Sequence, residues 1–196
     1  FTVGALQNVA AFDLESGEVV WSRDLMAELD APLMRRGYGA SPLVWRDLVI
    51  LTPGCKRDAE GGGAVVAFRQ SDGEPAWKSA ECFRPSYSSP ILATVDGAEQ
   101  VMVAMGSERA GFDPATGELR WRLTLGDEAV TTMSTQLWAD GGILFGSSAY
   151  ADGSRVVIGA CASAPAPFTA ALVDALRSGS AAEGLRDVSL AALADD

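Results

Sequence analysis

An eleven-residue pattern that ends in tryptophan occurs three times in this chain, and such a repeat constrains the fold more than composition does. The copies are Ala11–Trp21, Ala67–Trp77 and Gly111–Trp121. Their tryptophans lie 56 and then 44 positions apart. This spacing predicts a series of structural units of about 40–50 residues each.

Each copy has at its centre the composition of a tight turn between two β-strands. An aspartate opens the turn in the first and third copies, where its carboxylate can accept backbone N–H groups, and a glycine takes the position that needs a positive φ. The tryptophan that follows is a large apolar anchor whose indole N–H can reach a neighbouring loop. We therefore expect structural roles for Asp13, Gly17, Trp21, Gly73, Trp77, Asp113, Gly117 and Trp121.

A second pattern alternates with the first. Tyr38–Leu43 recurs as Tyr87–Ile91, and Ser134–Leu137 is a weaker copy with glutamine in place of proline. Each copy leads into two short apolar runs on either side of a turn dipeptide, which predicts a β-hairpin. Together the two patterns predict units of four short antiparallel strands with no helix between them.

Four-stranded units in series are typical of a β-propeller, in which each unit is one blade. We expect an all-β fold, a partial β-propeller. Residues 1–25 supply three strands of one blade, residues 41–79 and 89–125 supply two complete blades, and residues 135–150 begin a fourth. A closed ring has about 4–8 blades, so a homodimer that completes one ring is an expected arrangement.

The pattern changes after the repeats. We expect two regions: propeller repeats of an incomplete ring over residues 1–157, and an Ala-rich tail over residues 158–196, made of a loop followed by helix. Phe168, Leu172 and Leu176 recur at helical spacing, and residues 181–194 could form a second helix.

The repeats resemble the pyrroloquinoline-quinone-like (PQQ-like) repeat family of β-propellers. The resemblance rests on the motif A-x-D-x-x-T-G-x-x-x-W, matched closely at 11–21 and 111–121 and loosely at 67–77, and on Tyr-x-x-Ser-Pro at 38–42. Some members of this family are quinoprotein dehydrogenases that bind the quinone and Ca²⁺ on the propeller axis and oxidise alcohols or sugars. Others keep the repeats without the cofactor and serve as scaffolds. The resemblance also implies a periplasmic or secreted location.

Composition excludes several function classes. The chain has 15 Lys and Arg, 26 Asp and Glu, no His and a net charge of -11. This acidity argues against nucleic acid and against an anionic membrane surface as partners. Without histidine, Ser-His-Asp and Cys-His nucleophiles are excluded. No apolar run reaches the length of about 18 residues that a transmembrane helix needs, and no signal peptide is visible.

The three cysteines are Cys55, Cys82 and Cys161, and no two of them form a CxxC motif. They therefore predict neither a zinc knuckle nor a disulfide framework. An odd number leaves at least one free thiol or an intermolecular bridge.

Arginine and tyrosine precede the inner strand of two predicted blades. Arg36 and Tyr38 lead into one blade, and Arg84 and Tyr87 lead into the next. In a propeller such loops line the mouth of the central channel. In a chain with a net charge of -11 they would form a local anion-binding surface. The alternative is repeat homology alone, with packed tyrosines and solvated arginines.

The leading function is a non-catalytic propeller module that binds a protein or a small ligand through these loops or through a strand edge. We expect no catalytic residue, no metal site and no cofactor. The alternative is a fragment of a PQQ-dependent alcohol or sugar dehydrogenase, with PQQ and Ca²⁺ as cofactors. The adjacent cysteine pair of the alcohol-oxidising branch does not occur in this sequence, and no acidic residue matches the Ca²⁺ ligands.

Overall fold

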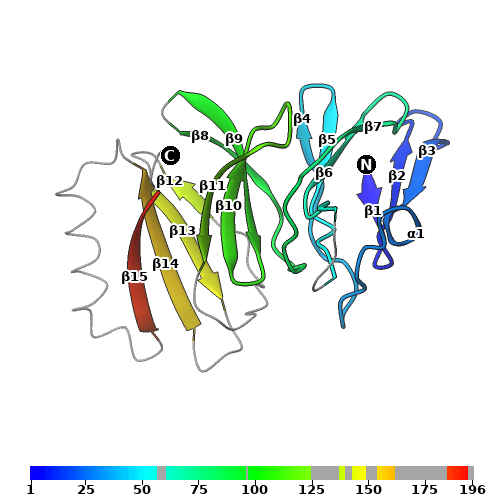
Figure 1. Ribbon diagram of the computed structural model, residues 1–196. Helices are drawn as coiled ribbons and strands as arrows, with labels where there is room; N and C mark the ends of the chain where they lie inside the picture. The colour runs from blue at the N-terminus through cyan, green and yellow to red at the C-terminus, as the bar shows by residue number, and fades with distance from the viewer. Residues whose placement is uncertain are drawn as a thin grey trace.

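In the computed structural model of this chain, the regular secondary structure of the described residues is almost entirely β-sheet (Figure 1). The structure describes residues 1–56, 61–95 and 97–124, and beyond them the backbone of four strands between residues 137 and 193. The strands form four sheets that follow one another along the chain (Figure 1). The predicted all-β partial propeller is therefore confirmed.

The first three sheets have the order and direction expected of blades, because each strand pairs antiparallel with the next one in sequence. Their strands are β1 (Thr2–Val3), β2 (Asn8–Phe12) and β3 (Val19–Asp24); β4 (Leu43–Trp45), β5 (Leu48–Leu51), β6 (Val66–Arg69) and β7 (Pro75–Lys78); and β8 (Ile91–Val95), β9 (Ala98–Met105), β10 (Glu108–Phe112) and β11 (Leu119–Thr124).

The fourth sheet departs from the blade pattern at its last strand. It contains β12 (Leu137–Ala139), β13 (Ile143–Ser148), β14 (Ser154–Cys161) and β15 (Leu185–Leu193), and β15 pairs parallel with β14. The second helix that residues 181–194 suggested is therefore wrong over Leu185–Leu193. The free backbone groups of β14 offer this segment a ladder of hydrogen bonds, and such tertiary pairing overrides local propensity. The helix suggested by Phe168–Leu176 lies outside the described residues.

One short helix was not expected from the sequence. Helix α1 (Leu25–Leu29) follows β3, and the Asp24 carboxylate accepts the N–H groups of Met26 and Ala27 at 3.0 and 3.1 Å. The Glu28 carboxylate accepts the N–H of Asp24 at 3.3 Å. This reciprocal cap is the sequence signal for the helix, an aspartate followed by a glutamate one turn later. Across the described part of the chain, no helix has the length and apolarity needed to cross a membrane.

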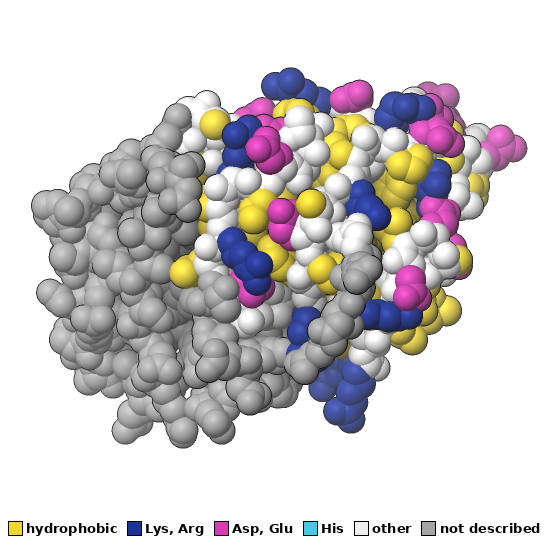
Figure 2. All heavy atoms as spheres, in the orientation of Figure 1, with side chains coloured by type: hydrophobic (Ala, Val, Ile, Leu, Met, Phe, Trp, Pro, Cys, Tyr) yellow, Lys and Arg dark blue, Asp and Glu magenta, His cyan; other side chains and the backbone are white. Residues whose placement is uncertain are grey.

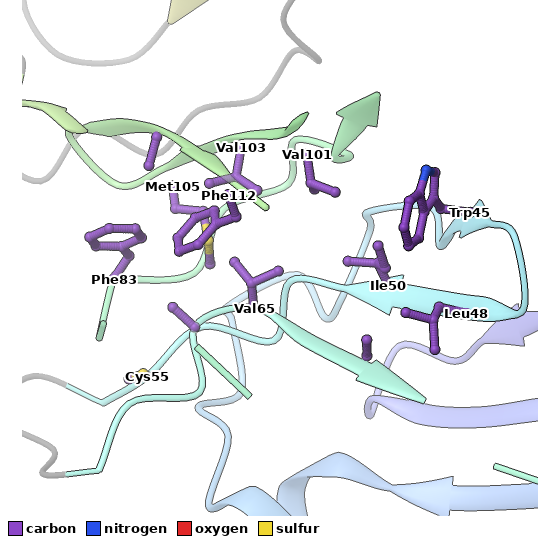
Figure 3. Packing of buried hydrophobic residues seen from close by; sticks show 13 residues of the cluster. Trp45, Leu48, Ile50, Cys55, Val65, Phe83, Val101, Val103, Met105 and Phe112 are labelled. Carbon is purple, nitrogen blue, oxygen red and sulfur yellow. The ribbon is translucent and has the colours of Figure 1, made fainter. Parts of the chain in front are cut away.

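Apolar side chains fill the space between consecutive sheets. One buried cluster joins the first sheet to the second, and a larger one joins the second sheet to the third. In Figure 3, Ile50 and Val65 of the second sheet lie opposite Val101 and Phe112 of the third. Each sheet thus buries one face against the next, which is how a blade too thin to form its own core is stabilised.

The repeated turns have the geometry that their residues predict. Oδ1 of Asp13 accepts the backbone N–H groups of Glu15 and Ser16 at 3.0 and 2.8 Å. Oδ1 of Asp113 accepts the two equivalent N–H groups at 2.8 and 3.0 Å. The turn glycines Gly17, Gly73 and Gly117 have φ values of 73°, 70° and 73°. Only glycine adopts this conformation without steric cost.

Two of the repeat tryptophans join neighbouring sheets. Nε1 of Trp21 donates to the carbonyl of Gln70 at 2.8 Å, in the turn of the second sheet. Nε1 of Trp77 donates to the carbonyl of Pro114 at 3.1 Å, in the turn of the third sheet. Trp121 differs, because its Nε1 donates at 2.7 Å to the side chain of Gln100 within its own sheet.

Candidate functional site

The loop that leads into β4, residues 31–42, is fastened to the first sheet. The N–H of Tyr38 donates to the carbonyl of Ala5 at 2.8 Å. Gly37 has a φ of 78°, and a Cβ at this position would lie 2.8 Å from the Cβ of Ala5. The Tyr38 ring is buried, and its hydroxyl accepts the N–H of Thr52 at 3.3 Å. We call this segment the pre-β4 loop.

The Tyr38 hydroxyl is part of the fold rather than of an open surface. Burial raises the pKa of Tyr38 above its ordinary value, although its hydrogen bonds with Thr52 act in the opposite direction. A neutral, buried phenol that is already bonded to Thr52 is not available to a ligand. The structure therefore gives Tyr38 the packed role that was the alternative for this residue.

The loop that leads into β8, residues 79–90, is fastened in a similar way to the second sheet. A Cβ on Gly54 would lie 2.7 Å from Pro85, so the two backbones approach as closely as a glycine allows. The N–H of Cys55 donates to the carbonyl of Phe83 at 2.8 Å. On its other side the loop is joined to the third sheet, because the Ser86 hydroxyl donates to the carbonyl of Ala104 on β9. We call this segment the pre-β8 loop.

The two loops contact each other directly. The backbone N–H of Arg36 donates to the Tyr87 hydroxyl at 3.1 Å, and the N–H of Ser41 donates to the Ser89 hydroxyl at 2.8 Å. The Tyr87 ring also lies against Gly39, where a Cβ would be 3.3 Å from the ring. Loops from consecutive sheets thus form one continuous surface.

Three arginines lie on this surface. Arg35 and Arg36 in the pre-β4 loop and Arg84 in the pre-β8 loop are all exposed. In Figure 2, Lys and Arg side chains gather at the lower edge of the described part, where the loop before β4 lies in Figure 1. Guanidinium groups donate in pairs to carboxylate and phosphate oxygens. The surface is therefore chemically suited to an anionic group.

The sequence pointed to the loop residues but not to their anchors. The structure brings Arg36 and Tyr87 into contact, whereas Tyr38 is buried in the interior. The anchors Ala5, Thr52 and Ala104 belong to other strands and turns, and only Gly37 directly before Tyr38 gave a local signal of close approach.

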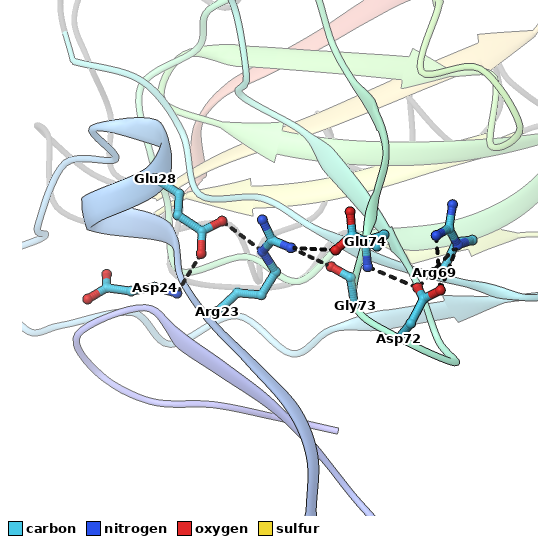
Figure 4. Close-up of polar contacts among 7 residues, drawn as sticks. All are labelled: Arg23, Asp24, Glu28, Arg69, Asp72, Gly73 and Glu74. Carbon is cyan, nitrogen blue, oxygen red and sulfur yellow. Dashed lines mark hydrogen bonds and ion pairs between the residues drawn. The ribbon is translucent and has the colours of Figure 1, made fainter.

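An apolar cleft of about 300 Å³ lies between the first two sheets, lined by side chains that include Val66, Phe68 and Trp77. Arg23 crosses its edge, with its guanidinium 5.3 Å from the centre of the Phe68 ring. Figure 4 shows Arg23 held between Glu28, bonded at 2.7 Å, and the carbonyl of Gly73, bonded at 2.9 Å. Because this cation is already paired, the cleft supplies apolar contact rather than charge.

The described residues do not fit a calcium-quinone site. No three acidic or cysteine side chains come together within residues 1–56, 61–95 and 97–124 in a way that could hold a metal ion. Cys55 and Cys82 come from separate segments and not from an adjacent pair. The described part of the chain therefore supplies no carboxylate cluster for Ca²⁺. The expectation that the protein has no cofactor stays a prediction.

Comparison with known proteins identifies the repeats. The sequence model of a PQQ-like repeat family, described as "Outer membrane protein assembly factor BamB", matches residues 1–163. The chain belongs to this BamB-like family of PQQ repeat propellers. The family match extends past the expected end of the repeats at residue 157, to a point just beyond β14.

A solved structure shows the same fold. The crystal structure of BamB from Moraxella catarrhalis superposes with a TM-score of 0.53 at 17% sequence identity. The superposition covers 80% of this chain and 48% of that one. The chain thus spans about half the length of the BamB structure. No curated protein matches this sequence.

Proposed function

We propose that this chain is a non-catalytic BamB-like propeller module that binds an anionic segment of a partner protein through the joined pre-β4 and pre-β8 loops. The observation that supports this most strongly is the pair of hydrogen bonds between the loops, from Arg36 to Tyr87 and from Ser41 to Ser89. These bonds hold the backbone of the arginine-bearing segments in place before any partner arrives. A surface ordered in advance loses less conformational entropy on binding.

Charge is the second support. The whole chain has a net charge of -11, so its overall field repels an anionic partner. The exposed arginines of the two loops are a local exception to that field. Binding of an acidic peptide would therefore require a locally basic surface, because the overall charge of the chain opposes it.

The proposal is tested with two labelled peptides of opposite charge. Fluorescence anisotropy would be recorded with a fluorescein-labelled hexaglutamate and with a hexalysine of the same length, at low and at physiological salt. We expect saturable binding of hexaglutamate that weakens as salt rises. Hexalysine binds any acidic surface and serves as the control for non-specific attraction. Absence of hexaglutamate binding at low salt would contradict the proposal.

The open face of the first sheet is a second proposed binding surface, for another blade of the same repeat type. Phe12 is 41% exposed, whereas its equivalents Phe68 and Phe112 are buried under the preceding sheet. Leu14, in the first turn, is 98% exposed. The covering blade would come from a second copy, in a homodimer that completes a ring, or from another part of a longer protein. Light scattering distinguishes these sources, since a second copy doubles the 20.4 kDa mass.

A periplasmic location is part of the same proposal. The family description refers to outer membrane protein assembly, which takes place on the periplasmic side of that membrane. Fractionation of a cell that expresses the full-length protein tests this directly, with the protein expected among the periplasmic or membrane-associated proteins.

A further inference from the structure

Two cysteines that lie 27 positions apart in sequence meet at the lower end of the second sheet. The N–H of Cys55 donates to the carbonyl of Phe83, the residue after Cys82, at 2.8 Å. The thiol of Cys82 donates to the carbonyl of Lys56, the residue after Cys55, at 3.6 Å. The thiol of Cys55 donates to the carbonyl of Gly62 at 3.4 Å, and the nearby Cys82 acts on its pKa. The contacts of the two backbones therefore hold the two cysteines side by side.

The two thiols differ in environment. Cys55 belongs to the buried cluster between the second and third sheets, and Figure 3 shows it at the end of that cluster. Burial, together with a smaller effect of the neighbouring Cys82, raises the pKa of Cys55 to about 12. Cys82 packs against the same cluster but is only partly buried. Solvent therefore reaches Cys82 more easily.

A polar cavity borders this pair. It has a volume of about 410 Å³, and its lining includes Cys55, Lys56, Lys78 and Gly62. The lining also contains Glu28 and Asp30, and Lys56 is paired with Asp30, so the cavity carries charges of both signs. Its size accommodates part of a peptide-like thiol compound next to the sulfur of Cys55.

We propose that Cys55 and Cys82 are a reversible dithiol–disulfide site that exchanges with a low-molecular-mass disulfide. The thiolate of Cys82 attacks one sulfur of the external disulfide, forms a mixed disulfide and releases one thiol. The thiolate of Cys55 then attacks the sulfur of Cys82 and releases the second thiol. The protein loses two protons and two electrons, and the external disulfide gains them.

The resulting bond would add a covalent link between two segments that are now held by hydrogen bonds and packing. One is the segment after β5 that contains Cys55, and the other is the pre-β8 loop, which contains both Cys82 and Arg84. A bond between them closes a loop that includes all of β6 and β7. Closing a loop of this length stabilises the folded state chiefly by restricting the unfolded chain.

The test uses oxidised glutathione and the full chain at pH 8. Samples are acid-quenched over time and analysed by intact mass and by peptide mapping without reduction. We expect a transient glutathione adduct on Cys82, followed by a Cys55–Cys82 linked peptide. The second step is expected to be slower and to accelerate with pH, because Cys55 is rarely ionised at pH 8. A persistent adduct on Cys82, or two thiols that remain free, would overturn the proposal.

Matched variants separate the two roles. Cys55→Ser should stop the reaction at the mixed disulfide, whereas Cys82→Ser should leave Cys55 largely unmodified. Cys161→Ser is the control and should yield the same linked peptide as wild type. We also expect the melting temperature of the oxidised protein to rise by several degrees and to return after reduction with dithiothreitol. An unchanged or lowered melting temperature would show that the bond does not fit the native fold.

Discussion

The indole ring of Trp77 occupies the space that a side chain on Gly117 would fill, since a Cβ on this glycine would lie 2.3 Å from the ring. The indole N–H is bonded to Pro114 in the same turn. Trp21 and Gly73 repeat this relationship one sheet earlier, with a distance of 2.6 Å. Besides the buried clusters, the contact between consecutive blades therefore includes a tryptophan from one blade and a glycine turn from the next.

Substitution of the turn glycines separates this contact from backbone strain. Gly17 and Gly117 share a φ of 73°, but a Cβ on Gly17 would meet nothing within 4 Å. Gly17→Ala should therefore cost about 1–2 kcal/mol of unfolding free energy, from the left-handed backbone alone. Gly117→Ala should cost a further 1–3 kcal/mol or so, because the Trp77 ring must move. Denaturant unfolding measures both values. Equal losses of unfolding free energy would contradict the packing of Trp77 against Gly117.

The blade repeats could be predicted from sequence because their signals are local. Asp13, Gly17 and Trp21 lie within one hairpin, so turn chemistry alone reveals them, and repetition gives the architecture. The partner of each tryptophan follows once the blades are placed in order. The exception is Trp121, whose hydrogen bond goes to Gln100 on β9. No repeat pattern predicts that bond, because Gln100 has no counterpart in the motif.

The candidate surface was predictable only in part. Tyr38 and Tyr87 occupy equivalent places in the repeat, yet one is buried against Thr52 and the other bonds the neighbouring loop. That difference depends on contacts between segments far apart in sequence. The strand at Leu185–Leu193 was missed for a similar reason, since its ladder partner lies in β14.

Asp113 should make folding stability depend on pH. Burial acts to raise the pKa of this carboxyl, but hydrogen bonds from Arg120 and from the N–H groups of Ala115 and Thr116 outweigh it and hold the pKa below its ordinary value. The stabilisation is complete above the unfolded-state pKa of 3.8 and is lost as pH falls through the lower folded-state value. Asp113→Asn should therefore flatten the acid side of the stability profile. Thermal unfolding between about pH 5 and pH 2 measures this, and an unchanged slope would count against the assigned bonds.

Arg109 is a buried cation at a position where other blades have valine. It is 2% exposed, and its Nε has no hydrogen-bond partner within the described residues. Burial lowers the pKa of Arg109 to about 10, against the opposing effect of Glu108. Val65, directly before β6, occupies the equivalent place and is fully buried.

Replacement of Arg109 by an apolar residue should be tolerated, because its buried charge is costly and valine fills the equivalent place. We expect Arg109→Met to leave the unfolding free energy unchanged or to raise it by about 1–4 kcal/mol, as for other buried charges replaced by apolar side chains. The reciprocal change Val65→Arg buries a new charge and should be strongly destabilising. Urea titrations of the two variants measure their unfolding free energies and so test both expectations. A large loss from Arg109→Met would show that the guanidinium stabilises the fold.

The central claim is that the arginines of the joined loops bind an anionic partner, and a double variant tests it most directly. The affinity for fluorescein-labelled hexaglutamate would be measured for Arg36→Ala/Arg84→Ala and for the control Arg46→Ala/Arg120→Ala. The control removes the same charge at positions that pair with Glu99 and Asp113, away from the two loops. We expect at least a tenfold loss of affinity in the first variant and less than a threefold loss in the control, with both folded as judged by circular dichroism. Equal affinities for the two variants would contradict the account.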